Sequence, residues 1–117
     1  MTSNFDNMTL EEIWNEIDVR LKEKPEPYKN MNAIYSIVLL GEDGGQFGLK
    51  FSDGNAETII GTPDESDCAL SMSVKDFKKL LGGNLNSVAS YMMGKLKVKG
   101  NVGLALELEN LLKKYSF

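Results

Sequence analysis

The stretch DCALSMSVKDFKKLLGGNLNSVASYMMGKLKVKGNVGLALELENLL, residues 67–112, decides the fold because its hydrophobic pattern changes repeatedly. Residues 68–72 alternate apolar with small side chains, as expected for a strand. Ser73, Asn86 and Asn101 are N-cap residue types, and each precedes a pattern typical of a helix. The stretch therefore predicts a strand, two helices, a second strand and a final helix.

The helices of this stretch have apolar faces that indicate how they pack. In the helix after Asn86 we expect Val88, Ala89 and Met92 to share a face, and Gly94 occupies the position where a left-handed residue closes a helix. The final helix carries an apolar side formed by Leu104, Leu108, Leu111, Leu112 and Tyr115.

The second strand of the stretch has one polar and one apolar face. Leu96 and Val98 are expected to point inward while Lys95, Lys97 and Lys99 point outward. Such a lysine row protects an exposed sheet edge from pairing with another chain. Alternatively, the lysines bind an anionic group of a ligand.

The N-terminal part predicts a helix. Thr9 and Glu12 form a T-x-x-E capping box, and the apolar spacing continues to about Lys24, where two prolines follow. We expect residues 1–8 to be a flexible lead-in and residues 9–117 to form a single domain.

The middle of the chain predicts three strands. Residues 31–40 are almost wholly apolar, which indicates a strand covered on both faces. Residues 47–52 alternate, the Asp53-Gly54 turn follows, and residues 56–61 complete an antiparallel meander. The predicted fold class is α+β, in the order α-β-β-β-crossover-β-α-α-β-α, with helices covering one face of a sheet.

Composition excludes several classes of function. The 117 residues carry a net charge of −4, which argues against a general nucleic-acid binder, because such proteins usually carry a basic surplus. No stretch approaches the roughly 20 apolar residues of a membrane span. The chain has no histidine, so Ser-His-Asp hydrolysis is excluded.

The remaining polar motifs are weak. Cys68 lies within a predicted strand and should be a small buried hydrophobe. The acidic group of Asp64, Glu65 and Asp67 matches no calcium loop, so we expect a solvated connector, no metal and no cofactor. The Gly100-x-x-Gly103 spacing is either a fragment of a phosphate-binding loop or a closely packed helix entry.

Taken together, these motifs resemble the sterol carrier protein 2 family, and the likeness extends from about Thr9 to Leu112. The resemblance implies a five-stranded, mostly antiparallel sheet with four to five helices over one face, enclosing an apolar tunnel. The features that carry it are Asp67-Cys68 before a short strand, the Asp76-Phe77 helix ending at Gly83, Asn86, the Gly94-Lys95-Leu96-Lys97 run, Gly100-Asn101 and Gly103-Leu104-Ala105.

By the same resemblance, the tunnel would be lined by side chains from the first helix, the sheet and the later helices. Carried over residue by residue, they are Ile17, Leu21, Phe47, Leu49, Phe51, Phe77, Leu81, Val88, Tyr91, Met92, Leu104, Leu108, Leu111 and Leu112. Lys95, Lys97, Lys99 and Lys113 are the expected contacts for a ligand's head group. Trp14 should lie near the tunnel, and the C-terminal helix is the expected lid.

The function implied is an intracellular lipid-binding and lipid-transfer protein, monomeric and not an enzyme by itself. It would hold fatty acids, fatty acyl-CoAs, sterols or phospholipids with low selectivity and make transient membrane contact. Two alternatives stay open: a protein-interaction or dimerisation module that uses the apolar C-terminal helix, and an accessory domain of a lipid-modifying enzyme. The cytoplasm is the expected location, with the peroxisome as the alternative, because the Tyr115-Ser116-Phe117 end differs from a Ser-Lys-Leu peroxisomal signal.

Overall fold

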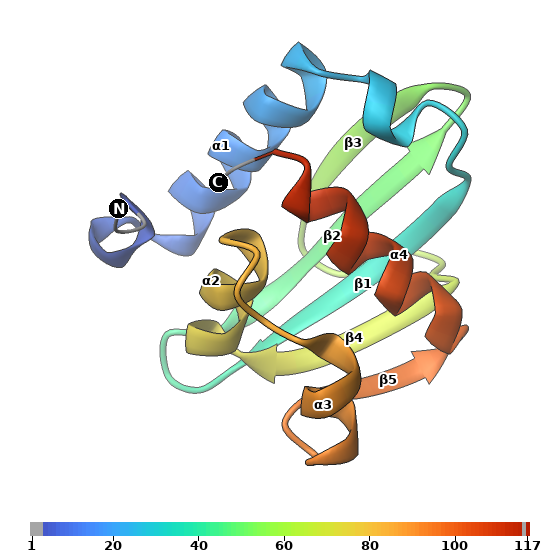
Figure 1. Ribbon diagram of the computed structural model, residues 1–117. Helices are drawn as coiled ribbons and strands as arrows, with labels where there is room; N and C mark the ends of the chain where they lie inside the picture. Colours follow the sequence, from blue (N-terminus) through green and yellow to red (C-terminus); the bar gives the residue numbers. More distant parts are fainter. Residues whose placement is uncertain (1–3, 116) are drawn as a thin grey trace.

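The computed structural model describes residues 4–115 and 117 and has a five-stranded sheet with helices against one face (Figure 1). The sheet order is β3-β2-β1-β4-β5. The elements are the 3-10 helix η1 (Asn4–Asn7), α1 (Leu10–Glu23), the 3-10 helix η2 (Glu26–Tyr28), β1 (Ala33–Leu40), β2 (Gly45–Ser52), β3 (Asn55–Ile60), β4 (Cys68–Ser73), α2 (Val74–Leu81), α3 (Ser87–Met92), β5 (Lys97–Gly100) and α4 (Val102–Lys113). This order confirms the prediction.

The sheet is mixed. β1, β2 and β3 form the predicted antiparallel meander, and β4 pairs antiparallel with β5. β1 and β4 are parallel, with Tyr35 opposite Cys68. The Asp67 carboxylate accepts a hydrogen bond from the Ile34 amide at 2.8 Å, and this contact aligns the start of β4 with β1. Asp67 thus has a structural role in the acidic connector.

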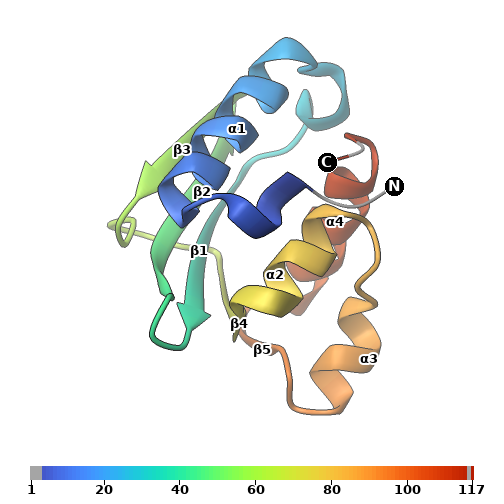
Figure 2. The ribbon, with the colours of Figure 1, turned by 90° about the vertical axis from the view of Figure 1, so that its left-hand side faces the viewer.

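The helices cover one face of the sheet only, and α2, α3 and α4 lie on the same side of it (Figure 2). Tyr35, Ile37 and Leu39 of β1 point toward the helices and are buried. On the other face Ile34 and Val38 are only half-buried and Leu40 is 52% exposed. The expectation that this strand is covered on both faces is therefore wrong, since its apolar run continues onto a face that no helix covers.

The helix starts follow from local hydrogen bonds. The Thr9 hydroxyl accepts from the Glu12 amide and the Glu12 carboxylate accepts from the Thr9 amide, which is the predicted capping box. Ser73, Asn86 and Asn101 cap α2, α3 and α4 through their side-chain oxygens. These contacts involve residues two or three positions apart, so the sequence alone reveals them.

The N-terminal segment differs from the predicted flexible lead-in. Asn4–Asn7 form a 3-10 helix, and Phe5 is buried at 3% exposure. The Phe5 ring lies 6.2 Å from the Phe117 ring, so the two ends of the chain lie close together. The correction applies to residues 4–8, because residues 1–3 lie outside the described residues. Phe5 and the half-buried Met8 pack this segment against the core.

The centre of the core is an aromatic stack around Trp14. The fully buried indole stacks between Phe47 and Phe77, with ring centroids 4.2 and 4.9 Å away. Its Nε1 donates to the Gly48 carbonyl at 3.2 Å, so the polar atom of the indole is satisfied. This stack joins α1, α2 and β2 into one packed unit.

No helix within residues 4–115 is long and apolar enough to cross a membrane.

Candidate functional site

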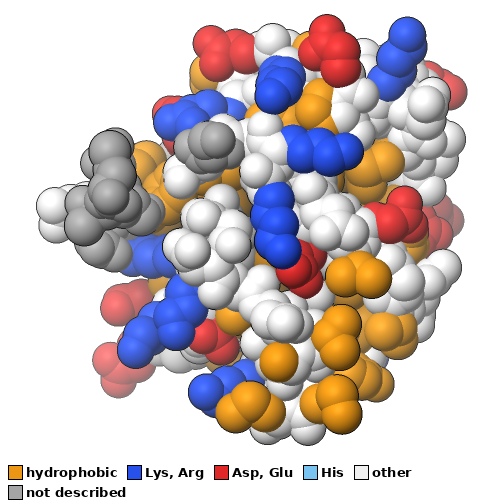
Figure 3. All heavy atoms as spheres, in the orientation of Figure 1, with side chains coloured by type: hydrophobic (Ala, Val, Ile, Leu, Met, Phe, Trp, Pro, Cys, Tyr) orange, Lys and Arg blue, Asp and Glu red, His pale blue; other side chains and the backbone are white. Residues whose placement is uncertain are grey.

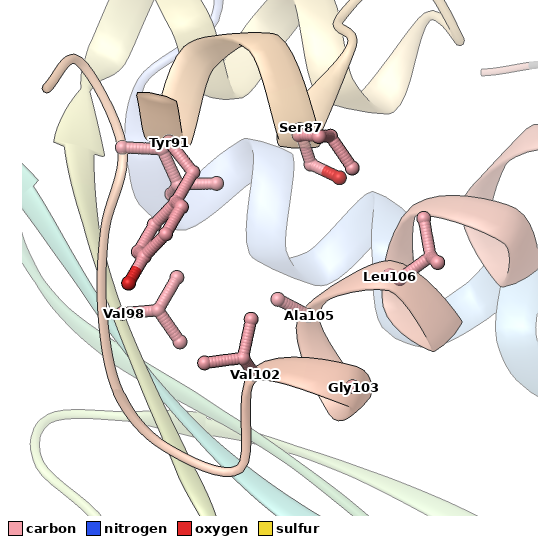
Figure 4. Close-up of a pocket in the computed structure, with 9 residues that line it drawn as sticks. Ser87, Tyr91, Val98, Val102, Gly103, Ala105 and Leu106 are labelled. Carbon is pink, nitrogen blue, oxygen red and sulfur yellow. The ribbon is translucent and has the colours of Figure 1, made fainter. Parts of the chain in front are cut away.

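A hollow of about 180 Å³ lies between α3, β5 and α4, toward one edge of the sheet (Figure 4). Tyr91 and Val98 lie on one side of it, Leu106 lies on the opposite side, and Ala105 and Val102 lie between them. The wall is almost entirely apolar, and it is open on one side. Its lining residues are Ser87, Val88, Tyr91, Leu96, Val98, Val102, Gly103, Ala105 and Leu106.

A polar contact beside the hollow joins α3 to α4. The Glu109 carboxylate, on a residue only 6% exposed, accepts hydrogen bonds from the Ser87 amide at 3.0 Å and from the Ser87 hydroxyl. Lys113 adds an ion pair at 2.8 Å. Burial raises the pKa of Glu109, but the hydrogen bonds from Lys113 and Ser87 outweigh burial, and the net pKa is below its ordinary value. The carboxylate is therefore ionised at neutral pH and holds the start of α3.

Exposed apolar side chains gather around the hollow (Figure 3). Among the described residues nine large apolar side chains are exposed, and six of them belong to α3, its C-terminal end and the first half of α4. We call these six the apolar rim. They are Val88, Tyr91, Met92, Met93, Val102 and Leu106, with Met92 79% and Met93 68% exposed. Exposed apolar residues concentrated in this way indicate a binding surface.

The predicted apolar face of α3, formed by Val88, Ala89 and Met92, is exposed. Val88 and Met92 point outward, while Ser87 and Ser90 are the buried residues of this helix. Ser90 accepts backbone hydrogen bonds from the amides of Lys95 and Leu96, so the chain folds back directly after α3. A helix of six residues is oriented by such contacts at its ends, and its hydrophobic side chains do not decide which face is buried.

Most of the predicted tunnel residues are packed in the core. The first group, all at most 5% exposed, is Ile17, Leu21, Phe47, Leu49, Phe51, Phe77, Leu81, Leu108, Leu111 and Leu112. Leu104 is half-buried against the same core. Val88 and Tyr91 line the hollow, whereas Met92 lies on the rim. Leu96, Val98, Val102 and Ala105 also line the hollow but were not among the predicted tunnel residues. The expected inward direction of Leu96 and Val98 could have identified those two.

The predicted head-group lysines are all exposed. Lys97 and Lys99 face away from the helices, because Val98 between them pairs with Leu70 on the helix-covered face. Lys113 is engaged by Glu109. Trp14, expected near the binding site, is absent from the lining of the hollow.

The C-terminal helix, which is the expected lid, is held by contacts with the rest of the domain. The Tyr35 hydroxyl donates to the Leu104 carbonyl at 2.8 Å, and the Tyr115 hydroxyl donates to the Lys24 carbonyl at 2.6 Å. Leu108, Leu111 and Leu112 are buried in the core. α3 is the less firmly held cover, since its buried side chains are two serines, and Gly94 after it has φ +79°.

The hollow as it stands is small for a lipid tail. A methylene takes up about as much volume as a water molecule, about 30 Å³. The volume of the hollow, about 180 Å³, therefore holds about six methylenes. Burying six methylenes contributes about 5 kcal/mol, and association alone costs at least about 4 kcal/mol. A whole tail therefore needs more room, from displacement of α3 or from extension along the rim.

Within residues 4–115 and 117, no group of three or more acidic or cysteine side chains could hold a metal ion. Cys68 is fully buried, and burial and then Asp67 raise its pKa to about 11. Both residues at the helix entry, Gly100 and Asn101, have a structural role. A Cβ on Gly100 would lie 2.5 Å from the Asp67 carbonyl oxygen, so only glycine fits there. Asn101 caps α4. The Gly100-x-x-Gly103 segment is thus a closely packed helix entry.

The α+β fold, with its five-stranded sheet and helices on one face, is that of a sterol carrier domain. Residues 14–113 match the model of the SCP-2 sterol transfer family, and the chain belongs to that family.

Known relatives agree with this assignment. Bovine hydroxysteroid dehydrogenase-like protein 2 is 41% identical over 85 residues, which is 72% of this chain and 20% of the relative. Human sterol carrier protein 2 is 28% identical over 94% of this chain and 21% of the relative. The apo structure of Sterol Carrier Protein 2 from Yarrowia lipolytica superposes with a TM-score of 0.72 at 29% identity, covering 99% of this chain and 98% of that one. The chain thus spans about a fifth of these longer relatives.

Proposed function

We propose that this protein binds and transfers lipids, with an acyl tail or sterol body entering the hollow between α3, β5 and α4. The observation that carries the proposal is an apolar hollow with an open side, surrounded by exposed apolar side chains. A site lined by polar residues would exclude such ligands. In the lining of this hollow the polar side-chain groups are the hydroxyls of Ser87 and Tyr91.

One route for uptake of a whole tail is movement of α3 away from α4. Ser87 is joined to Glu109, while the exposed side of α3 has no tertiary cover. Leu96, which is 4% exposed and lines the hollow beside α3, would then lose contacts that a lipid tail can replace. With about 14 methylenes buried at about 0.8 kcal/mol each, the gain is about 11 kcal/mol, enough to offset the cost of association.

Fatty acids, fatty acyl-CoAs, sterols and phospholipids are the proposed ligands. Selectivity should be low, because adding or removing one methylene alters apolar burial by only about 1 kcal/mol. Lys95, Lys97 and Lys99 are available for an anionic head group, whereas Lys113 would first have to leave Glu109. The protein acts as a cytoplasmic monomer in this proposal and performs no chemistry on its ligand.

Filling the hollow tests this function. Ala105→Phe places a ring on the floor of the hollow, and Val102→Trp fills it from a half-exposed position that tolerates a larger side chain. Each is compared with Val19→Phe, an enlargement at a 50% exposed position on α1. Titration with a fluorescent fatty acid should show at least a tenfold loss of affinity for the first two variants and none for the third.

Thermal unfolding of each variant shows whether it is folded. Unchanged affinity in folded Ala105→Phe and Val102→Trp proteins would place the lipid elsewhere. The buried tunnel residues of the core, such as Phe77 and Leu108, would then become the alternative location.

A second candidate function is an accessory domain that presents lipid to an enzyme. It is favoured by one observation: bovine hydroxysteroid dehydrogenase-like protein 2 matches this chain over only 20% of its length. Adding the purified chain to a lipid-modifying enzyme and measuring turnover tests it. A turnover rate independent of the chain would count against this role.

A further inference from the structure

The lining of the hollow divides into a mouth and a floor. Its most exposed side chains, between 43% and 53% exposed, form the mouth: Val88, Tyr91, Val102 and Leu106. Its buried side chains form the floor: Ser87, Leu96 and Ala105. Ser87 is the polar residue of the floor, and Figure 4 shows its side chain pointing toward α4. A lipid end that reaches the floor therefore meets a hydroxyl group.

A buried carboxylate lies directly behind this hydroxyl. Glu109 follows Ala105 by four residues on α4, so the two lie on one face of the helix, about 6 Å apart along its axis. The Glu109 carboxylate accepts hydrogen bonds from the Ser87 amide at 3.0 Å and from the Ser87 hydroxyl. The face of α4 that lines the hollow thus continues to a buried acid.

The hydrogen bonds already made decide what the floor can bind. A serine hydroxyl has one hydrogen and two lone pairs, and Ser87 donates its hydrogen to Glu109. The hydrogen of the Ser87 amide is also donated to Glu109, and an ionised carboxylate has none to give. Ser87 and Glu109 therefore offer only acceptors to a ligand. A polar ligand group is satisfied there only if it donates a hydrogen bond.

The charge of Glu109 selects in the same direction. Burial raises the pKa of Glu109, but the hydrogen bonds from Lys113 and Ser87 lower it more, so the carboxylate is ionised at neutral pH. Lys113 lies one turn farther along α4 and its side chain is 45% exposed, so it weakens the negative potential at the floor without cancelling it. A ligand carboxylate on the floor would meet a like charge and no donor.

We propose that Ser87 and Glu109 form a polar subsite on the floor of the hollow, which accepts a hydroxyl or amine at the far end of a lipid and rejects a carboxylate. The subsite rests on the proposed function, which it deepens by naming a class of ligand: lipids with a hydrogen-bond donor at the end that enters first. That donor binds the Ser87 oxygen. A simple fatty acid enters methyl end first and keeps its carboxylate at the mouth.

The subsite persists if α3 moves. Glu109 belongs to α4, which the Tyr35 hydroxyl holds through the Leu104 carbonyl at 2.8 Å and which buries Leu108 beside Glu109. If α3 moves away with Ser87, the carboxylate loses two donors and attracts a donor of the ligand more strongly. The selection by charge is therefore the same for either route by which a tail gains room.

Four acids of equal length test the subsite. Hexadecanoic acid ends in a methyl group, and its 16-hydroxy, 16-amino and 16-carboxy derivatives differ only at that end. Each displaces a bound fluorescent fatty acid at neutral pH. The 16-hydroxy acid should bind within about threefold of hexadecanoic acid, because its hydrogen bond to Ser87 offsets the burial of a hydroxyl.

The two charged ends separate the sign of the charge from the cost of burying any charge. The 16-carboxy acid should bind about 100-fold more weakly than hexadecanoic acid, because it brings like charges into contact. The 16-amino acid should bind at least about tenfold more tightly than the 16-carboxy acid, because an ammonium group donates hydrogen bonds and is attracted by Glu109.

Variants separate this selection from a structural role of Glu109. Glu109→Gln keeps an acceptor for Ser87 but removes the charge, so the 16-amino to 16-carboxy affinity ratio should fall to about twofold. Glu107→Gln, which changes an exposed acid on the same helix, should keep the wild-type ratio. Ser87→Ala should lower affinity for the 16-hydroxy acid about fivefold relative to hexadecanoic acid. Because each result is a ratio within one variant, a general loosening of α3 cancels.

The outcomes distinguish the subsite from the proposed function. Equal affinity of the wild-type protein for the 16-amino and 16-carboxy acids would refute the subsite, since a purely apolar floor excludes both charges alike. An unchanged ratio in Glu109→Gln would also refute it. Either result, together with binding of hexadecanoic acid, overturns the subsite alone and leaves the proposed function standing. If none of the four acids binds, both are refuted.

Discussion

Removing the Glu109 carboxylate is the perturbation that most directly tests how α3 is held. In Glu109→Ala the Ser87 amide and hydroxyl both lose their acceptor, and Ser87 is only 5% exposed. Lys113 loses its ion pair as well. The start of α3 then loses its hydrogen bonds to α4.

The magnitude follows from the bonds lost. Hydrogen bonds to a charged group are worth about 1.5–3 kcal/mol each, and a partly exposed ion pair adds about 0–1 kcal/mol. Losing both bonds from Ser87, with partial rehydration, should destabilise the fold by about 3 kcal/mol, or roughly 10 °C in Tm. Glu109→Gln keeps an acceptor for Ser87 and should cost about 1 kcal/mol.

Thermal unfolding and hydrogen exchange provide the assay. Glu107→Ala is the matched control, since Glu107 is an exposed acid on the same helix. Amides 87–93 should exchange faster in Glu109→Ala than in the control, and lipid release should accelerate because the cover over the hollow is loosened. Equal Tm and equal exchange in the Glu109 and Glu107 variants would refute the reasoning.

The same carboxylate predicts a pH dependence. Because the pKa of Glu109 is lowered in the folded state, its stabilisation is fully present above the ordinary value of 4.5. It is lost as the pH falls below 4.5 through the folded-state pKa. The stability difference between wild type and Glu109→Gln should therefore shrink over that acidic range, and a difference that stays constant would contradict the assigned ionisation.

The remaining predictions concern the core and one turn. Gly100→Ala should destabilise the fold by about 3 kcal/mol, because the new Cβ would clash with the Asp67 carbonyl and the backbone has φ +92°. Gly94→Ala should cost about 1 kcal/mol, because only its positive φ is unfavourable. Urea unfolding measures both free energies. Cys68 should resist thiol reagents until the protein unfolds, since it is buried and its pKa is raised to about 11; fast labelling of the native protein would contradict this. Trp14 emission should not change when lipid binds, because the indole is fully buried away from the hollow; a spectral shift would place ligand in the core.

Local patterns in the sequence were sufficient for the order of elements. The caps at Thr9, Ser73, Asn86 and Asn101 depend on residues two or three positions away, and the structure confirms each of them. The inward direction of Leu96 likewise follows from strand alternation. Family membership rested on the order and spacing of such short motifs, and it too is confirmed.

Contacts between distant residues decided the rest. The open face of β1, the burial of Phe5 and the outward direction of Val88 all depend on which elements happen to cover them. Residue type could not separate the core from the lining of the hollow, because Leu108 and Val98 are both apolar on inward faces.

The sequence by itself determined the elements, their caps and the family, because these depend on interactions within a few residues. Only the tertiary structure decided where the hollow lies and what holds it. Its walls come from three elements, and the contact that positions α3 joins Ser87 to Glu109, 22 residues apart. Packing between such distant residues fixes whether an apolar surface is filled by the protein or left available to a ligand.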